Sequence, residues 1–292
     1  LGDVYKRQHQ PYQIQSCSGY KKADKNRRTV SRIRTNPDKI NSQKNHRMKK
    51  VHFTDSYLIN PQHPVTVHLI GAGGTGSQVL EALARMDAAL IRLGHPGLYV
   101  TVFDADEVSE SNIGRQLFSP ADIGLNKAIC LVTRTNQFFG LDWEAVPEMY
   151  SDDAPSANIT ISCVDNVKSR LVIYQHLKQV NHISDVYESP LYWLDFGNTQ
   201  QTGQVILGTV KPVKQPKKAK YPTQATLPTL CDMFDLTQVD EQNSGPSCSV
   251  TEALRKQDLF INSTLAQNGC ALLWKLFREA KLEHHGVFLL SL

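Results

Sequence analysis

The hydrophobic positions alternate between short apolar runs and longer runs with helical spacing. The short runs predict buried strands at 65–70, 98–103 and 160–164. The longer runs place their apolar residues on one helical face, which predicts helices over 77–90, 124–139 and 168–180. This alternation predicts an α/β fold that is Rossmann-like, with a mostly parallel sheet covered by helices on both faces.

The second half of the chain carries a weaker version of the same pattern. Two more strands are predicted at 191–196 and 204–210, and a lysine- and proline-rich loop follows over 211–222. A helix is predicted over 258–280, with these core contacts: Leu259, Leu265, Leu272, Leu273, Leu276 and Phe277. We therefore predict one α/β domain over 48–210 and a loop-rich C-terminal extension over 211–292 that packs on the same domain.

Charge divides the chain unevenly. Residues 1–50 hold 14 Lys and Arg against 3 Asp and Glu, whereas the remaining 242 residues hold 18 against 25. Residues 1–47 lack apolar periodicity, so we expect a disordered basic tail there. One interpretation makes this tail non-native, with translation starting at Met48; a solvated native tail and a nucleic-acid-binding arm are the alternatives.

The sequence does not favour membrane or secretory classes. Its longest apolar runs are far shorter than the about 20 residues that span a bilayer. The six cysteines include no C-x-x-C pair, which favours reduced thiols over a disulfide framework. We expect a cytoplasmic protein that binds no membrane, and nucleic acid is not an expected partner of its acidic body.

A glycine-rich segment, Gly71-Ala72-Gly73-Gly74-Thr75-Gly76, lies between the first predicted strand and helix. In this context G-x-G-x-x-G marks a phosphate-binding turn, because glycine lets the backbone approach and the helix N-terminus presents free N–H groups. Asp104 ends the next strand, where an acidic side chain commonly bonds a ribose hydroxyl. The motif indicates a bound nucleotide but does not distinguish NAD, FAD and ATP.

The segment after Asp104 narrows the class of nucleotide-binding protein. Polar and charged residues follow at close spacing: Asp106, Asn112, Arg115, Gln116 and, in the next predicted helix, Lys127. Cations beside the phosphates stabilise the charge that develops when a phosphate is attacked. Asp165 follows a later strand, at the edge where such sheets bind ligands, and its carboxylate could hold Mg²⁺.

Four motifs therefore occur in order: G-A-G-G-T-G, D-A-D-E-V-S-E-S-N-I-G-R-Q, G-L-N-K and C-V-D-N. Over roughly residues 60–210 the chain resembles the adenylation domain of the ThiF/MoeB and ubiquitin-activating enzyme superfamily. Its C-terminal half, with L-P-T-L-C-D, P-S-C-S and Q-D-L-F-I-N-S, is similar to the ThiF-family member of the PRTRC system of mobile elements. The resemblance implies ATP-dependent adenylation of the C-terminal carboxylate of a small ubiquitin-like or sulfur-carrier protein by a homodimer.

The resemblance also implies roles for individual residues, by their position in these motifs. The residues implied to border the phosphates are Gly71, Gly73, Gly74 and Gly76. Asp104 would hold the ribose, and Asp165 would bind Mg²⁺. The residues implied to contact the phosphates are Asn112, Arg115 and Lys127, with Asp106 and Gln116 in support. Of these, the implied catalytic residues are Arg115, Lys127 and Asp165.

Two features depart from the superfamily pattern. Many members bind a structural zinc ion through two C-x-x-C pairs; this chain has no such pair, so we expect no structural zinc. Members also take an arginine from near the partner subunit's N-terminus, and no arginine lies between Met48 and Gly71. That role would be absent, or filled by Lys49, Lys50 or the basic tail.

A thiol is the remaining candidate catalytic group. Cys248, in P-S-C-S, resembles the thioester cysteine of ubiquitin-activating enzymes, and its thiolate could attack the adenylate. Free cysteines are more often small buried residues, so a structural Cys248 and a catalytic Cys231 are the alternatives. Cys130, Cys163 and Cys270 lie in predicted elements and are expected in the core.

Two other functions are open on the sequence alone. An NAD-dependent oxidoreductase would need an acid or base for hydride transfer in a second domain, and the sequence offers no persuasive residue for it. A non-catalytic nucleotide-binding adaptor of a mobile-element system would bind ATP without adenylating a partner.

Overall fold

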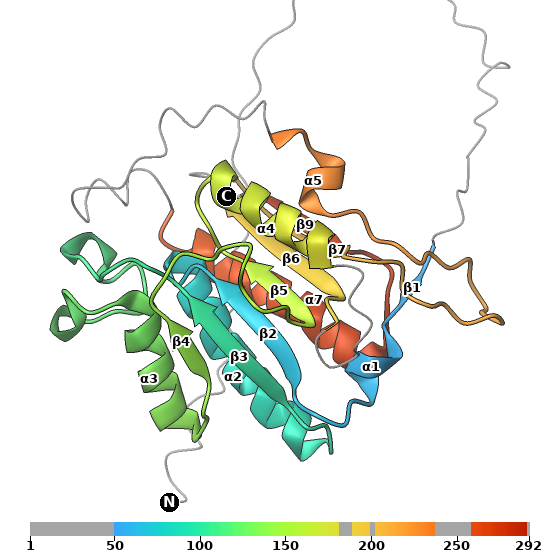
Figure 1. Cartoon of the computed structure of the whole chain (residues 1–292), viewed down its shortest axis with the longest axis horizontal. Helices are drawn as coiled ribbons and strands as arrows, with labels where there is room; N and C mark the ends of the chain where they lie inside the picture. The colour runs from blue at the N-terminus through green and yellow to red at the C-terminus, as the bar shows by residue number, and fades with distance from the viewer. Residues whose placement is uncertain (1–49, 181–188, 199–201, 237–257, 291–292) are drawn as a thin grey trace, which may run out of the picture. The chain divides into compact units, whose positions relative to one another are not determined.

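The structure is a computed structural model and describes residues 50–180, 189–198, 202–236 and 258–290. A seven-stranded sheet has the order β4-β3-β2-β5-β6-β7-β9 (Figure 1). Its mutually parallel strands are β4 (Glu144–Val146), β3 (Leu98–Phe103), β2 (Val65–Ile70), β5 (Ile159–Ser162) and β6 (Tyr192–Asn198). Two antiparallel strands complete it: β7 (Thr202–Thr209) and β9 (Gly286–Leu290). The predicted mostly parallel α/β sheet is thus confirmed.

Helices cover both faces of this sheet (Figure 1). One face carries α2 (Gly74–Arg92), α3 (Lys127–Phe139) and α7 (Ile261–Glu279), and α2 packs on both of the others. The other face carries α4 (Val167–Val180) and the short α5 (Leu230–Met233). Because successive strand residues point to opposite faces, Leu69 joins the core under α2 and α7, while Ile70 joins the core under α4.

Short elements join distant parts of the described chain. β1 (His52–Phe53) pairs antiparallel with β8 (Lys281–Leu282), and α1 (Ser56–Ile59) packs on α7. Two 3₁₀ turns, Glu110–Asn112 and Pro120–Asp122, lie between β3 and α3. Among the described residues, no helix combines the length and apolar character needed to cross a membrane.

The helix predicted over 258–280 begins later than expected, at Ile261. Leu259 precedes the first turn and is 44% exposed, so its prediction as a core contact is wrong. The other expected contacts are buried: Leu265, Leu272, Leu273, Leu276 and Phe277. Four of the described strands escaped prediction: β1 and β8 have two residues each, β4 has three, and the apolar run of β9 is short.

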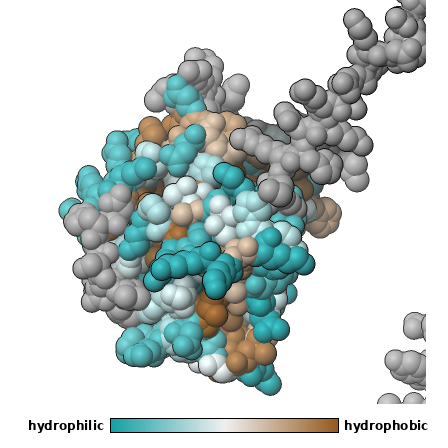
Figure 2. All heavy atoms as spheres, turned by 90° about the vertical axis from the view of Figure 1, so that its right-hand side faces the viewer, coloured by the Kyte–Doolittle hydropathy of each residue, from teal (hydrophilic) through white to brown (hydrophobic). Residues whose placement is uncertain are grey.

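The lysine- and proline-rich segment over 211–222 is a loop, as predicted, but it is anchored at its base. Val213 is buried, and the Gln215 side chain bonds both the N–H and the C=O of Phe53 at 2.9 and 3.0 Å. Figure 2 shows the side of the molecule on which this loop projects in Figure 1; its surface is mostly hydrophilic, with separate hydrophobic patches. The contacts of Gln215 tie the start of the loop to β1.

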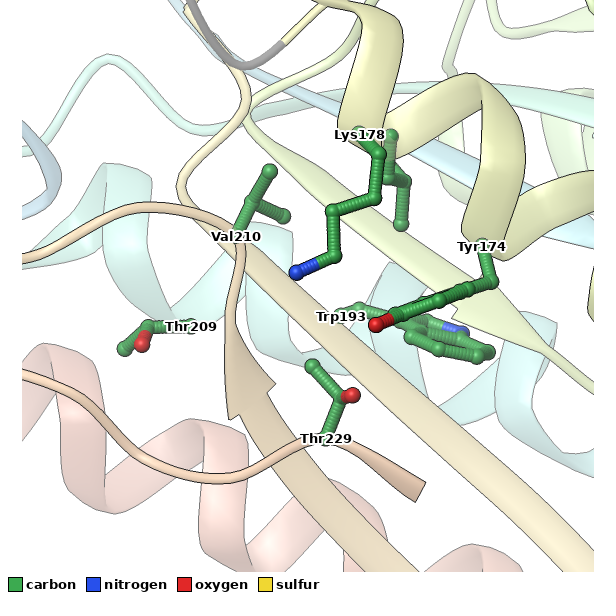
Figure 3. A pocket seen from close by; sticks show the side chains of 7 residues that line it. Tyr174, Lys178, Trp193, Thr209, Val210 and Thr229 are labelled. Carbon is green, nitrogen blue, oxygen red and sulfur yellow. The ribbon is translucent and has the colours of Figure 1, made fainter. Parts of the chain in front are cut away.

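A small hollow lies between α4 and the strands beneath it (Figure 3). Tyr174 and Lys178 of α4 face Trp193 of β6 and Thr229, and the Lys178 Nζ lies 5.0 Å from the Tyr174 ring centroid. Trp193 is at the start of β6, whereas ligands of parallel sheets bind where the strands end. The hollow therefore lies away from the glycine-rich loop that follows β2.

A buried histidine gives the fold a pH dependence. His68 lies in β2, and its ring contacts Phe103 and Tyr150 edge-on. Burial and, secondarily, the nearby His176 lower the pKa of His68 from 6.5 to about 4. In the unfolded chain this imidazole regains its ordinary pKa, so protonation on acidification favours unfolding.

The free energy of unfolding should therefore fall as the pH drops from 6.5 toward 4, because the unfolded chain takes up the His68 proton first. Between pH 7 and pH 5 this group alone contributes a loss of about 2 kcal/mol. Urea unfolding at both pH values measures it, and His68→Gln should lack this part of the decrease. An equal decrease in both proteins would contradict the assignment.

Candidate functional site

The glycine-rich loop joins β2 to α2, which begins at Gly74. Gly71 has φ +92°, and a Cβ there would lie 2.7 Å from the carbonyl oxygen of Cys163. A Cβ at Gly76 would overlap the carbonyl oxygen of Gly71, so the loop and the first turn of α2 touch backbone to backbone. The turn places the N-terminal N–H groups of a 19-residue helix at the end of β2, which suits an anion.

Asp104 ties the end of β3 to this loop. Its Oδ2 accepts the Ala72 N–H at 2.6 Å, and its Oδ1 accepts the Asp106 N–H at 2.9 Å. Burial raises the pKa of the Asp104 carboxyl, and these two bonds and Lys127 counter the rise. Both oxygens keep a further lone pair, so the group can still accept a ribose hydroxyl.

Lys127 starts α3 and points back to the same edge of the sheet. Its Nζ lies 2.8 Å from Asp106 Oδ2, and its backbone N–H donates to the Asp106 carbonyl at 2.9 Å. The lysine side chain is 10% exposed, while that of Asp106 is 69% exposed. Asn126 caps α3 by accepting the Ile129 N–H at 3.0 Å, and this cap fixes Lys127 as the first residue of the helix. The structure thus brings Asp104, Asp106 and Lys127 together.

The turn after β3 carries the other predicted residues. Asn112 is buried and accepts from the Ser109 N–H at 2.9 Å, which makes it part of a local cap. Arg115 is half-buried, and desolvation lowers the pKa of its guanidinium. Gln116 is buried, and its Oε1 has no hydrogen-bond partner within the described part of the chain. A buried acceptor of this kind fits a site that a ligand completes.

An ion pair between Arg134 and Asp122, which was not predicted from the sequence, stabilises the end of this turn. Arg134 of α3 lies 2.6 Å from Asp122 Oδ2 and donates to the Leu117 carbonyl at 2.8 Å. Burial acts to raise the pKa of the Asp122 carboxyl, but the bond from the Ser119 N–H and, next, the one from Arg134 hold it well below its usual range. The segment that follows Arg115 is therefore anchored to α3.

Asp165 follows β5 at the same edge and is exposed. Asn166 donates to Asp165 Oδ1 at 3.0 Å and accepts the Ser169 N–H at 2.8 Å, as a helix cap does. In the described ranges, no three His, Cys, Asp or Glu side chains form a metal cluster. Mg²⁺ commonly needs only one or two carboxylates besides a nucleotide's phosphates, so a single Asp165 fits that ion.

Two cysteines, Cys231 and Cys248, are candidate nucleophiles, and three others are expected in the core. Cys248 lies outside the described residues. Cys231, in α5, is half-buried, and burial raises the pKa of its thiol to about 11, which disfavours it as a nucleophile at neutral pH. Of the thiols expected in the core, Cys130 and Cys270 are buried and Cys163 is half-buried.

Asn262, in the first turn of α7, contacts the glycine-rich loop and was missed by sequence reasoning. Its Oδ1 accepts from Thr75 Oγ1 at 3.0 Å and from Asn198 Nδ2 at 3.1 Å. A Cβ at Gly74 would lie 2.5 Å from Asn262 Nδ2, so the amide covers that glycine directly. No sequence signal could reveal this contact, because Thr75 and Asn262 are 187 positions apart.

Asn262→Ala should lower the free energy of unfolding by about 1–3 kcal/mol, because the buried Thr75 hydroxyl and the Asn198 amide lose an acceptor. Asn268→Ala is the matched control on the same helix, since the Asn268 amide only donates to the Thr264 carbonyl. It should change the free energy by about 0.5 kcal/mol or less. Urea unfolding of both variants measures the difference. Equal losses of free energy would show that the hydrogen bonds of Asn262 do not stabilise the fold.

The ThiF family matches residues 63–273, and the chain belongs to this family. None of the curated protein sequences matches it. Among solved structures, E. coli MccB is similar at TM-score 0.52 and 16% identity, over 80% of this chain and 60% of that one. PaaA is 16% identical over 77% of this chain and 60% of that one, at TM-score 0.49. The chain therefore spans about three fifths of the length of these proteins, and the likeness to MccB supports the fold.

Proposed function

We propose that the chain uses ATP to adenylate the C-terminal carboxylate of a small ubiquitin-like or sulfur-carrier protein. One observation carries the proposal: a glycine-rich loop, a ribose-type acid and a cation-bearing turn meet at one edge of the sheet. The loop contains Gly71, Gly73, Gly74 and Gly76. Asp104 directly follows β3, Lys127 begins α3, and Arg115 lies in the segment between these two residues. A hydride-transfer enzyme needs only the first two features.

In this reaction a carboxylate oxygen attacks the α-phosphorus of ATP, and the bond to the β-phosphate oxygen breaks. Pyrophosphate leaves, and a mixed acyl phosphate anhydride with AMP remains. Two anions must approach each other, so the protein has to hold them and offset their charge. The loop N–H groups would hold the phosphates, and Asp104 would accept a ribose hydroxyl.

The cations act on the departing phosphates. Asn112, Arg115 and Lys127 would contact them, with Gln116 in support. Asp106 would orient the Lys127 ammonium through its 2.8 Å ion pair. A Mg²⁺ ion at Asp165 would neutralise further phosphate charge when bound. Cys248 could then accept the acyl group from the adenylate as a thioester, with AMP as the leaving group.

The proposed subfamily, oligomeric state and cellular location rest on the sequence resemblance. The C-terminal motifs support membership of the PRTRC branch and action within a mobile-element system. A homodimer in the cytoplasm is part of the same proposal. Size measurement of the purified chain by light scattering would test the dimer separately from the activity.

ATP–pyrophosphate exchange tests the proposed reaction. The assay uses the full chain, Mg²⁺, and a small carrier protein with an exposed C-terminal glycine, beside the same carrier lacking that residue. We expect exchange with the intact carrier only. ATP binding without exchange at saturating carrier would instead indicate a nucleotide-binding adaptor, and tighter binding of NAD than of ATP in calorimetry would indicate an oxidoreductase.

A further inference from the structure

A buried ion pair lies beside the Asp165 loop. Arg170, in α4, donates from Nε to Asp195 of β6 at 3.1 and 3.4 Å. The side chains of this pair are 11% and 1% exposed, respectively. Ser162 at the end of β5 adds a bond from Oγ to Asp195 Oδ1 at 2.5 Å. The pair therefore joins β5, β6 and α4 below the edge of the sheet.

The rest of the Arg170 guanidinium binds backbone. Its Nη2 donates to the Val164 carbonyl at 2.7 Å and to the Phe196 carbonyl at 2.9 Å, and its Nη1 lies 3.4 Å from the Asn166 carbonyl. Val164 and Asn166 are the two neighbours of Asp165 in the chain. The planar guanidinium of Arg170 thus binds the backbone on both sides of the Asp165 carboxylate. A lysine could not replace it, because its ammonium lacks this forked arrangement of donors.

Stability alone does not account for such a pair. Burial raises the pKa of the Asp195 carboxyl, and Arg170 and Ser162 counter the rise. Desolvating two charges costs about as much as their attraction returns, and well-packed apolar residues often replace such pairs without loss. What apolar residues could not supply is the set of donors that holds the Asp165 loop.

We propose that Arg170 is a positioning residue that, anchored by Asp195, holds Asp165 where it serves the reaction. The inference rests on the proposed function, because Asp165 acts in that reaction. Asp165 is itself exposed, and Asn166 binds it from the adjacent position in the same loop. The orientation of the carboxylate is therefore set by the loop backbone that Arg170 holds.

The decisive variant removes both charges with little change of volume, Arg170→Met with Asp195→Asn, and the amide keeps an oxygen that can accept from Ser162. We expect the variant to fold with a lower melting temperature, because the Val164 and Phe196 carbonyls lose a donor, and with a KM for ATP close to that of the wild type. The kcat of pyrophosphate exchange should fall about 100-fold, as a misplacement of about 1 Å can produce. The Mg²⁺ concentration for half-maximal exchange should rise as well. A folded double variant with wild-type kcat and Mg²⁺ dependence would overturn the inference.

Arg170→Lys serves where the double variant fails to fold. It keeps the charge beside Asp195 but loses the fork, so kcat should fall and the Mg²⁺ requirement should rise at a nearly constant KM for ATP. Arg85→Lys, at an exposed arginine of α2 paired with Glu81, is the matched control and should leave all three values unchanged. Wild-type kcat in Arg170→Lys would overturn the proposal.

Amide hydrogen exchange separates this inference from the proposed function. If wild type itself shows no pyrophosphate exchange, the proposed function fails, but the positioning role still predicts a local effect. The backbone amides of 163–166 should exchange faster in Arg170→Lys, while those of β2 keep their protection. Unchanged exchange in 163–166 would contradict the positioning role whatever the reaction is.

Discussion

Gly76→Ala should abolish nucleotide binding and lower the free energy of unfolding by about 3 kcal/mol or more. A Cβ at this position overlaps the Gly71 carbonyl oxygen, and that atom is backbone, which cannot rotate away. The loop and the first turn of α2 would have to separate, which moves the helix N–H groups away from the phosphates. Calorimetric titration with ATP and urea unfolding measure the two effects.

Gly73→Ala is the control for the folding half of this prediction. A Cβ at Gly73 meets no heavy atom within 4 Å, so alanine there would clash with neither backbone nor side chains. Its free energy of unfolding should stay within about 1 kcal/mol of wild type. If Gly76→Ala unfolds at the same urea concentration as wild type, the close contact between loop and helix does not exist as described.

Lys127→Met should reduce the rate of pyrophosphate exchange by about 100- to 1,000-fold, which corresponds to losing one preorganised charge at the transition state. Methionine keeps the length of the buried stem, and the exposed Asp106 carboxylate returns to water, so the fold should survive. Single-turnover and steady-state exchange assays, with melting temperature alongside, measure the effect.

Lys178→Met is the matched control, because Lys178 lies over Tyr174 on α4, at the end of the sheet away from the loop. It should leave the exchange rate within about twofold. Asp106→Asn should lie between the two, since it removes the carboxylate that orients Lys127 but keeps the ammonium. Exchange within twofold of wild type in Lys127→Met would remove this lysine from the catalytic set.

The parts of the site that the sequence could predict are the local ones. The glycine loop, Asp104 and Asp165 follow strands whose apolar runs are readable in a short window, and parallel strands bring their ends to one edge. The segment from Asp106 to Lys127 was also predictable, because it connects two such elements.

The supporting contacts could not be predicted in this way. Asn262 reaches Thr75 from 187 positions away, and Asp195 reaches Arg170 from the next strand in the sheet. Whether a polar residue in a predicted element faces solvent or a distant loop depends on packing that no periodicity records. The misassigned Leu259 has the same origin, since an apolar residue just before a helix belongs to its pattern but not to its buried face.

The order of synthesis determines when the contact between Thr75 and Asn262 can form. Ribosomes add about 5–20 residues per second from the N-terminus, so the glycine loop is made well before α7. Until α7 docks, Thr75 has no Asn262 to bind, and until β9 pairs with β7 that strand keeps an open edge. The glycine-rich loop is thus synthesised well before α7 and is completed only after α7 has been made and has docked.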